Sequence, residues 1–572
     1  MSVEANRTLS QSKALFFSWI IAICILTFPL IVSFLTIGWR FLFNLFAADS
    51  MYYIGIANNW VKYGFPTFDG EQITNGFHPL WELLIAGVFW LFHVPYDYQL
   101  YVVFVLSFVL ILISLTLLGS IAMSRFGLVR GGTALLLMFP GAYTLLCNPV
   151  SRVSGDPGAL YRVEPWSAIN GMENTLSLAL WSLAIYLVIR RLEIGKKYGE
   201  AIDQSVDWPF IINLPVRIVL VGIVLTRLDD AIILTSIGIV ALLFNTGSTR
   251  QRIHELSKIL ILPVIALVAY ISINLAVMGT PLPVSGAGKT GFALLRNLHM
   301  FINAVLGRSI GWGWAYLAER AYAVIFCVTS AIISIILLST KLKGAKENFR
   351  LYQLALILFL YILVKSLFLI FLVNIGNQGY WYYFVMIFTL NFIIASALIS
   401  AIPARRIYEY TALAGAAMLV TLALGTESHL IGAREGMLDD HWLSNYAETA
   451  YQLWTHNNDI REAFHKQDPS AKLIDNFDGM YGYLLDMPAI SVTGLVSGKK
   501  DLDDRRKAGF WDSVLPRGYS IISNIGYLRL PNETGIKWRE FYKSPDGKIE
   551  FYQVMLAAPE DTGGPGTTSA TH

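Results

Sequence analysis

The sequence predicts an all-α polytopic membrane domain of about eleven transmembrane helices followed by a C-terminal soluble α/β or α+β domain. Of its 572 residues, 55% are hydrophobic and 15% charged, and the mean hydropathy is +0.53. Apolar runs recur, and several are long enough to cross about 30 Å of hydrocarbon. Acidic residues are concentrated in the C-terminal part of the chain, where residues 427–572 contain 21 of the 40 Asp and Glu residues. We therefore expect a membrane domain at 1–425, a soluble domain at 426–562 and a disordered tail at 563–572.

The apolar runs set the number of crossings. The first, Ala14 to Trp39, exceeds the roughly 7–15 residue core of a signal peptide and has no small-residue cleavage site, so we expect a retained transmembrane helix. Residues 80–92 are short and contain Glu82, which is typical of an interfacial helix. The remaining runs lie at about 99–123, 129–147, 174–190, 209–226, 229–245, 257–278, 321–340, 352–375, 381–402 and 408–425.

Basic residues predict the orientation, because cytoplasmic loops are enriched in Lys and Arg. If residues 80–92 do not cross, the basic segments all fall on the side of the N-terminus; they are Arg125/Arg130, 190–197, 249–258, 341–350 and 404–406. We therefore predict a multi-pass protein of a bacterial plasma membrane, with a cytoplasmic N-terminus and a periplasmic or extracytoplasmic soluble domain.

The soluble domain shows strand and helix patterns. The segments "AKLIDNFDG", "AISVTGLV", "YSIISNIGYL" and "GKIEFYQVML" predict strands, and residues near 437–466 predict helices. The three cysteines all fall within apolar stretches, which argues against a disulfide scaffold or a cysteine metal cluster. A net charge of +3 gives no indication of a nucleic-acid partner.

The predicted topology brings unusual polar residues to the external face. The first external loop contains "FAADSMYYIGIANNWVKYGFPTFDGEQITNGFHPLW" (46–81), and loops 148–172, 279–318 and 376–380 share its side. We expect one outward-facing cavity lined by ionisable, polar and aromatic residues from these loops and from 227–230. The candidates are Asp49, Tyr53, Asp69, Glu71, Asn75, His78, Arg152, Arg162, Glu173, Arg227, Asp229, Lys289 and Trp381.

This combination of groups favours one chemistry. Ionisable groups beside apolar membrane walls are costly, so they are functional candidates by default. An external carboxylate, cations and an apolar groove are what sugar transfer from a lipid phosphate requires. The lipid tail lies among the helices, Lys or Arg neutralises the phosphate, and the carboxylate removes a proton from the acceptor hydroxyl.

The motifs also resemble a family. In order, "ADSMYYIGIANNWVKYG", "TNGFHPLW", "NGMENTLSLAL", "LTRLDD", "GTPLPVSGAGK" and "GYLLDMPAISVTGLV" resemble the GT-C superfamily of polyprenyl-phosphate-dependent glycosyltransferases, in particular the actinobacterial arabinofuranosyltransferase type. The resemblance implies that Asp49 is the general base of a single, inverting displacement. It also implies that Lys289 and Arg227 face the donor phosphate and that Glu173 and Asp229 shape the cavity.

The sequence departs from the family pattern at three places. Ala48-Asp49 replaces an acidic pair, "RLD" replaces R-P-D, and "LPVSGAGK" lacks the usual Asn-Thr. Arabinofuranose is therefore one candidate sugar. The implied partners are a polyprenyl-phosphate-linked sugar, a glycan or glycoconjugate acceptor of the cell envelope, and membrane lipid.

A metal remains an open alternative at this stage. No cofactor is indicated with certainty. Asp49, Asp69 and Glu71 offer oxygen ligands for a divalent cation such as Mg, Mn or Ca, although they are spread along one loop.

Each candidate also has an ordinary structural explanation. Asp49 can cap the helix that begins near Met51, a role compatible with catalysis. Glu173 can be a favourable acid in a first helical turn. Arg227 and Asp229 can form a local ion pair.

Three further candidates have similar alternatives. His78 precedes Pro79, where the interfacial helix begins. Lys289 can be solvated, or its Gly-rich loop "SGAGKTG" can bind an anion. Trp381 belongs to "YWYYF", which is typical of an aromatic belt, with carbohydrate stacking as the alternative.

Two other classes of function remain. A transporter or flippase of lipid-linked sugars would show internal repeats and charges near mid-span; the sequence has no convincing repeat, and its charges lie towards one face. A non-catalytic cell-envelope assembly subunit would depend on the soluble domain and not on Asp49.

Overall fold

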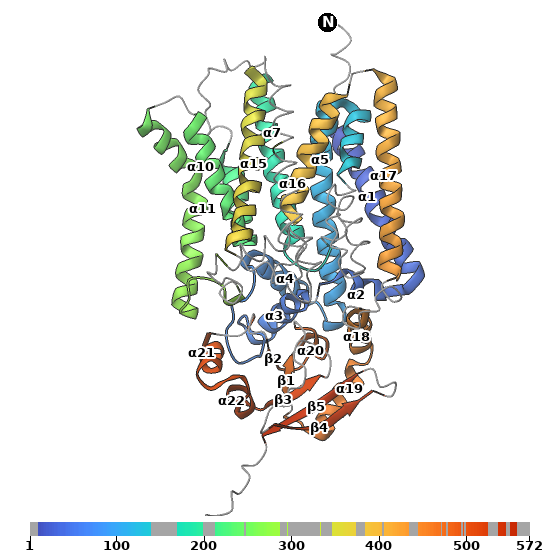
Figure 1. Cartoon of the computed structure of the whole chain (residues 1–572), viewed down its shortest axis with the longest axis vertical. Coiled ribbons are helices and arrows are strands. Elements are labelled where there is room, and N and C mark those ends of the chain that lie inside the picture. Colours follow the sequence, from blue (N-terminus) through green and yellow to red (C-terminus); the bar gives the residue numbers. More distant parts are fainter. Residues whose placement is uncertain are drawn as a thin grey trace, which may run out of the picture.

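A computed structural model describes most of the chain. The described residues are 10–47, 49–138, 169–197, 212–244, 248–285, 295, 332, 346–372, 384–402, 405–433, 444–470, 472–475, 479–492, 496, 499–523, 536–544 and 549–556. They form a bundle of long helices with a smaller domain of helices and strands at one end (Figure 1). The prediction of a mostly helical part with apolar spans, followed by a C-terminal part that contains a sheet, is confirmed for these residues.

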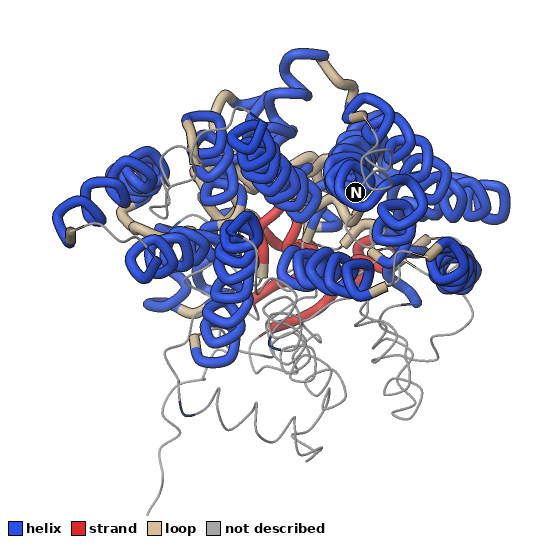
Figure 2. The backbone as a smooth tube through the Cα atoms, turned by 90° about the horizontal axis from the view of Figure 1, so that it is seen from above, coloured by secondary structure: helices blue, strands red, loops and turns tan. Residues whose placement is uncertain are grey.

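The bundle is built from long apolar helices. They are α1 (Gln11–Ile37), α5 (Gln99–Leu137), α7 (Asn174–Lys197), α9 (Leu214–Thr226), α10 (Ile232–Phe244), α11 (Thr249–Met278), α15 (Lys346–Phe371), α16 (Phe384–Ala401) and α17 (Arg406–Ala433). Seen from above, the strands of the end domain appear behind the middle of the bundle (Figure 2). Within the described residues, four stretches are long and apolar enough to cross a membrane, namely Gln11–Leu45, Tyr96–Leu137, Asn174–Glu193 and Thr249–Met278. The count of eleven spans stays a prediction.

Helix α5 contains a chain reversal at Gly127. This residue has φ 80° and ψ 172°, a backbone conformation that favours glycine. A Cβ on Gly131 would lie 2.3 Å from the Cα of Met123, and one on Gly119 would lie 2.8 Å from Leu135. In a straight helix, residues 119 and 135 would be about 24 Å apart. The chain therefore folds back at Gly127, between the two predicted runs 99–123 and 129–147.

Short helices close the end of the bundle that faces the strands (Figure 1). They are α2 (Phe41–Leu45), α3 (Ser50–Tyr63) and α4 (Pro79–Phe92), and the 3-10 turn η2 (Tyr96–Tyr98) follows α4. Just before α4, His78 contacts Glu173; just after it, Tyr96 donates to the carbonyl of Tyr483 in the end domain. Both ends of α4 thus lie at the same end of the bundle, as expected for an interfacial helix.

Basic residues gather at the opposite end of the bundle. Arg125 is 26 residues along α5 from Gln99, a rise of about 39 Å. It lies 3.7 Å from Glu193, which also pairs with Arg190 at 2.6 Å. Arg130 donates to the carbonyls at the end of α16. This is the distribution that the topology prediction requires; which end faces the cytoplasm stays a prediction.

The end domain contains a mixed five-stranded sheet in the order β2-β1-β3-β5-β4. Its strands are β1 (Lys472–Asp475), β2 (Ala489–Ser491), β3 (Tyr519–Ser523), β4 (Ile536–Lys543) and β5 (Glu550–Leu556). β1 pairs in parallel with β2 and β3, with Leu473 opposite Ala489 and Ile521, and β5 pairs antiparallel with β3 and β4. Four of these strands were predicted. The fifth, β4, was not.

Helices complete the end domain. They are α18 (Ser444–Thr455), α19 (Asn457–Gln467), α20 (Met480–Leu484), α21 (Lys499–Ala508) and α22 (Phe510–Val514), followed by the 3-10 turn η8 (Leu515–Arg517). Phe464 of α19 packs edge-on against Phe541 and Phe551 of the sheet. The preceding bundle helix, α17, continues to Ala433, beyond the predicted domain boundary at Gly425.

Candidate functional site

The site begins at Arg227, where the chain leaves α9. The guanidinium is 1% exposed and donates from Nη1 to Glu173 Oε1 at 2.6 Å. It also donates from Nε and Nη2 to the two carboxylate oxygens of Asp229, each at 3.1 Å. Such fork-like contacts are stronger and more directional than single ones. Three sequence-predicted residues therefore meet in one buried cluster.

The cluster continues into the bundle through residues that the sequence analysis did not select. Lys365 of α15 contacts Asp230 and lies 3.3 Å from Asp229 Oδ2. Tyr361 donates to Asp230 Oδ1 at 2.6 Å, and Ser177 of α7 donates to Asp230 Oδ2 at 3.1 Å. Asp230 and Lys365 are both fully buried. The charged cluster, defined as Glu173, Arg227, Asp229, Asp230 and Lys365, therefore combines two cations with three carboxylates.

The electrostatics of the turn between α9 and α10 favour the charged forms of Arg227 and Asp229. Burial alone would raise the pKa of Asp229, but the charges of Arg227 and Lys365 hold that pKa well below its ordinary value. Burial alone would lower the pKa of Arg227, but Asp229 and Glu173 raise it well above its ordinary value. Both residues lie in the turn between α9 and α10, and both stay ionised at neutral pH.

Two further predicted residues contact Glu173. Tyr53 of α3 donates from its hydroxyl to Glu173 Oε2 at 3.1 Å. Nε2 of His78, at the start of α4, lies 3.5 Å from Glu173 Oε1. Burial, followed by the charge of Glu173, raises the pKa of Tyr53 well above its ordinary value, so this phenol stays protonated. Glu173 thus connects the first external loop with the end of α9.

The segment that carries Asp49 lies against the segment that carries Glu173. Gly171 has φ +76°, and a Cβ at this position would lie 2.5 Å from Phe46 and 2.7 Å from Ser50. The N–H of Ala47 donates to the carbonyl of Asn170 at 3.0 Å. Only glycine permits both this backbone conformation and this close approach. Asp49 itself takes the N-cap position of α3 without a side-chain capping hydrogen bond.

Asn75 connects the first loop with the segment "GTPLPVSGAGK". Its Oδ1 accepts from the N–H of Val284 at 3.1 Å, and its Nδ2 donates to the carbonyl of Leu282 at 3.5 Å. Val284 precedes Lys289 by five residues. Asn75 therefore holds the chain that leads to Lys289.

Asp69 and Glu71 lie elsewhere, at the contact between the first loop and the end domain. Asp69 Oδ1 accepts from the N–H groups of Glu71 and Gln72, and its Oδ2 lies 3.0 Å from Arg517. Glu71 pairs with Arg517 at 3.1 Å and also with Lys472. These two acids attach the end domain, and the structure does not bring them into the charged cluster.

Several predicted positions lie outside the described residues. They are Lys289, Trp381, Arg152 and Arg162. Among the residues that are described, no three or more His, Cys, Asp or Glu side chains gather as a metal site would require. Asp69 and Glu71 are bound to cations of the end domain instead.

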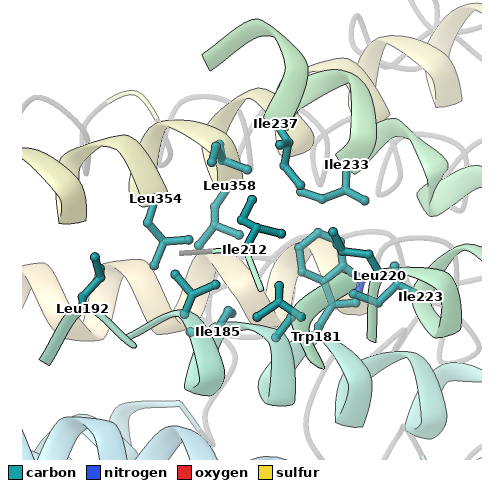
Figure 3. Close-up of a pocket in the computed structure, with 14 residues that line it drawn as sticks. Trp181, Ile185, Leu192, Ile212, Leu220, Ile223, Ile233, Ile237, Leu354 and Leu358 are labelled. Atoms are coloured by element: carbon teal, nitrogen blue, oxygen red, sulfur yellow. The ribbon is translucent and has the colours of Figure 1, made fainter. Parts of the chain in front are cut away.

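A small apolar pocket lies in the bundle beside the charged cluster. Figure 3 shows its lining side chains, which come from α7, α9, α10 and α15 and from Ile212, two residues before α9. They include Trp181, Ile185, Leu192, Ile233 and Leu358. The Trp181 ring lies 4.4 Å from the ring of Tyr361, whose hydroxyl bonds Asp230. The pocket therefore has an apolar body with ionic groups close to one end.

Sequence signals existed for the residues that were missed. Lys365 interrupts the apolar run 352–375, and a charge in such a run marks a functional candidate. Asp230 follows Asp229 directly in "LTRLDD". Nothing in the sequence, however, indicates that these two distant positions form a pair.

Comparison with solved structures finds similar chains, and two of them are structures of ArnT. The crystal structure of ArnT from Cupriavidus metallidurans bound to undecaprenyl phosphate has a TM-score of 0.48 and 11% identity, covering 94% of this chain and 99% of that one. The apo structure of ArnT from the same organism has a TM-score of 0.46 and 14% identity, with the same coverage. No protein-family model and no curated protein matches the sequence. The assignment of a function therefore rests on the geometry of this chain.

Proposed function

We propose that this protein is a membrane glycosyltransferase. It takes a sugar from a polyprenyl-phosphate donor and transfers it to a glycan or glycoconjugate at the extracytoplasmic face of a bacterial plasma membrane. Arabinofuranose is the sugar suggested by the family resemblance of the motifs. The supporting features are the charged cluster, the apolar pocket beside it and the adjacent segment that carries Asp49.

One observation carries the proposal: the charged cluster, with its two cations and three carboxylates, lies beside one end of an apolar pocket within the bundle. Arg227 and Lys365 are fully buried among carboxylates, next to Tyr361 and Trp181. A polyprenyl phosphate has the matching form, since its chain is apolar and its head is anionic. In this arrangement the isoprenoid chain occupies the pocket, and the phosphate lies towards Arg227 and Lys289.

The transfer is a single displacement at the anomeric carbon. Asp49 removes the proton from the acceptor hydroxyl while that oxygen forms the new glycosidic bond. The bond from the anomeric carbon to the phosphate oxygen breaks, and its electron pair leaves with the phosphate. Cations near the phosphate stabilise the charge that develops on it, so no acid is required to protonate the leaving group. The products are the extended glycan and a polyprenyl phosphate, with inversion at the sugar.

The residues around Asp49 have positioning roles in this proposal. Gly171 brings the Asp49 segment against the start of α7, and Glu173 holds Arg227, Tyr53 and His78 together. Asp229 orients the guanidinium through its two contacts.

The direct test uses the purified full-length protein in detergent or nanodiscs. It is supplied with a synthetic polyprenyl-phosphate sugar, labelled in the sugar, and a cell-envelope glycan acceptor. The proposal predicts label in the glycan and release of polyprenyl phosphate. Movement of the intact labelled lipid across a liposome membrane, with no label in the glycan, would instead support the flippase alternative.

A further inference from the structure

A second, polar pocket lies between the first external loop and the end domain. It shares no lining residue with the charged cluster or with the apolar pocket. One wall is α3 together with the turn at Phe68–Gly70, and the other is α20 with the turn that follows it. Figure 1 shows α3 and α20 at this junction. We call it the junction pocket.

The α3 wall presents one polar face to this pocket. Its lining residues Gly55, Asn58, Asn59, Lys62 and Tyr63 follow the i, i+3, i+4, i+7, i+8 spacing of a single helix face. Such a face against another domain is normally apolar. Here it carries two amides, an ammonium and a phenol, and at Gly55 a Cβ would contact Tyr483 at 3.5 Å and Phe68 at 3.9 Å. Polar groups on a face between two domains indicate a ligand or ordered water.

The amides offer complementary hydrogen bonding. Asn58 Oδ1 accepts from Gln99 at 2.8 Å, which orients the Asn58 NH₂ group as a donor. Asn59 Nδ2 donates to the carbonyls of Thr67 and Phe68, each at 3.1 Å, which leaves its Oδ1 as an acceptor. The pocket thus has both donors and acceptors held in place by the surrounding fold.

The opposite wall contains two unusual residues. Asp486 has φ +46°, a left-handed conformation that is uncommon outside glycine and clusters at functional sites. Its carboxylate lies 3.3 Å from Arg461 and 3.9 Å from Lys62, so its charge is already compensated. Tyr483 is 2% exposed, and its hydroxyl has no hydrogen-bond partner among the described residues. A buried phenol of this kind suits a ligand hydroxyl.

We propose that the junction pocket binds a neutral sugar unit of the acceptor glycan. This inference rests on the proposed glycosyltransferase function. The hydroxyl groups of a sugar unit can accept a hydrogen bond from Asn58 and donate to Asn59 and Asp486. Its apolar face can pack against the aromatic ring of Tyr63. The charges of the pocket are balanced within the protein, which favours a neutral ligand over a phosphate. Contact with both domains places the acceptor beside the loop that carries Asp49.

The test measures binding and transfer separately with the full-length protein. Binding of neutral tetrasaccharides of arabinofuranose, mannose and galactofuranose, each as its methyl glycoside, is titrated by calorimetry. Gly55→Leu fills the pocket, and Tyr63→Ala removes a half-exposed ring at its edge. The matched control is Tyr98→Ala, because Tyr98 is an exposed tyrosine of η2 that does not line the pocket. Melting and gel filtration confirm that each variant is folded.

The expected result is saturable binding of one of these tetrasaccharides, weakened at least tenfold by Gly55→Leu and by Tyr63→Ala but unchanged by Tyr98→Ala. The acceptor KM should rise in parallel, with little change in the donor KM. Absence of saturable binding, or equal affinity in wild type and both folded pocket variants, overturns the junction-pocket proposal. If the protein binds the glycan here but transfers no sugar, the proposed function fails and the pocket stands. If the protein transfers sugar with an unchanged acceptor KM in both variants, the junction-pocket proposal fails and the proposed glycosyltransferase function stands.

Discussion

The guanidinium of Arg227 lies 2.6 Å from the carboxylate of Glu173, and neither side chain is more than 1% exposed although 54 residues separate them. This pair joins the start of α7 to the end of α9. Removing one partner of a buried ion pair leaves an uncompensated charge and costs about 3–5 kcal/mol. The pair is therefore a structural requirement of the site, whatever substrate the site binds.

Glu173→Ala should lower the melting temperature of the detergent-solubilised protein strongly, because it leaves Arg227 buried with less compensation. The double variant Glu173→Ala/Arg227→Met should lose less stability than the sum of the two single variants. The control is Glu193→Ala, which removes the partly exposed pairs with Arg190 and Arg125 and should cost about 1 kcal/mol or less. Additive losses in the double variant would show that Glu173 and Arg227 are not coupled.

Gly171→Ala should destabilise the fold by about 2 kcal/mol or more, because the new Cβ meets Phe46 and Ser50 at under 3 Å in a left-handed backbone conformation. Gly87→Ala on α4 is the matched control. No atom lies within 4 Å of a Cβ there, so that change should be neutral or slightly stabilising. The measurement is again the melting temperature. Equal effects of the two variants would mean that the contact between the Asp49 and Glu173 segments is not tight.

The contact of the first loop with the end domain should weaken in acid. Despite partial burial, which alone would raise it, hydrogen bonds from Lys472 and Arg517 lower the pKa of Glu71 below its ordinary value of 4.5. A lowered native-state pKa stabilises the fold above the unfolded-state pKa, and this stabilisation is lost as the pH falls through the native-state pKa.

The melting temperature should therefore be measured from pH 7 down to pH 3. At neutral pH the melting temperature of the wild type should exceed that of Glu71→Gln, and this difference should disappear towards pH 3. Because Glu71 is partly exposed, the difference should be small and should shrink in high salt. A difference that does not change between pH 7 and pH 3 would contradict the ion-pair explanation.

Filling the apolar pocket should block the lipid donor selectively. Ile185→Phe adds volume to a buried position in the pocket, whereas Leu243→Phe adds the same ring to an exposed position of α10. The donor KM should rise at least tenfold in the first variant and stay unchanged in the second, and the acceptor KM should stay the same in both. A donor KM unchanged by Ile185→Phe in a folded protein would place the isoprenoid chain elsewhere.

Much of the architecture could be predicted from local patterns. Long apolar runs predict the bundle helices, and four strands of the end domain follow from apolar segments bounded by Gly, Asp and Pro. β4 was missed because its alternation breaks: the register shifts between Glu540 and Tyr542, so the apolar positions change from even to odd residues along "IKWREFYK". A pattern of period two cannot be recognised across such a bulge.

The site was predictable only in part, because it depends on long-range packing. Glu173, Arg227 and Asp229 could be selected since each stands at the end of an apolar run. The partnership of Lys365 with Asp230 spans 135 residues, and no local signal specifies it. In the sequence, Asp69 and Glu71 resemble acids that would line the cavity. In the structure, both bind Arg517, which lies 446 residues after Glu71.

The most direct test of the account is sugar transfer by Asp49→Asn. The substitution keeps the shape of the side chain at the N-cap position of α3 but removes the base. Purified Asp49→Asn should melt like wild type and lose transfer from a labelled polyprenyl-phosphate sugar by about 10²- to 10⁴-fold. Asp97→Asn, at an exposed acid near the same end of the bundle, should transfer normally. Transfer by Asp49→Asn at the wild-type rate would contradict the central claim that Asp49 is the general base.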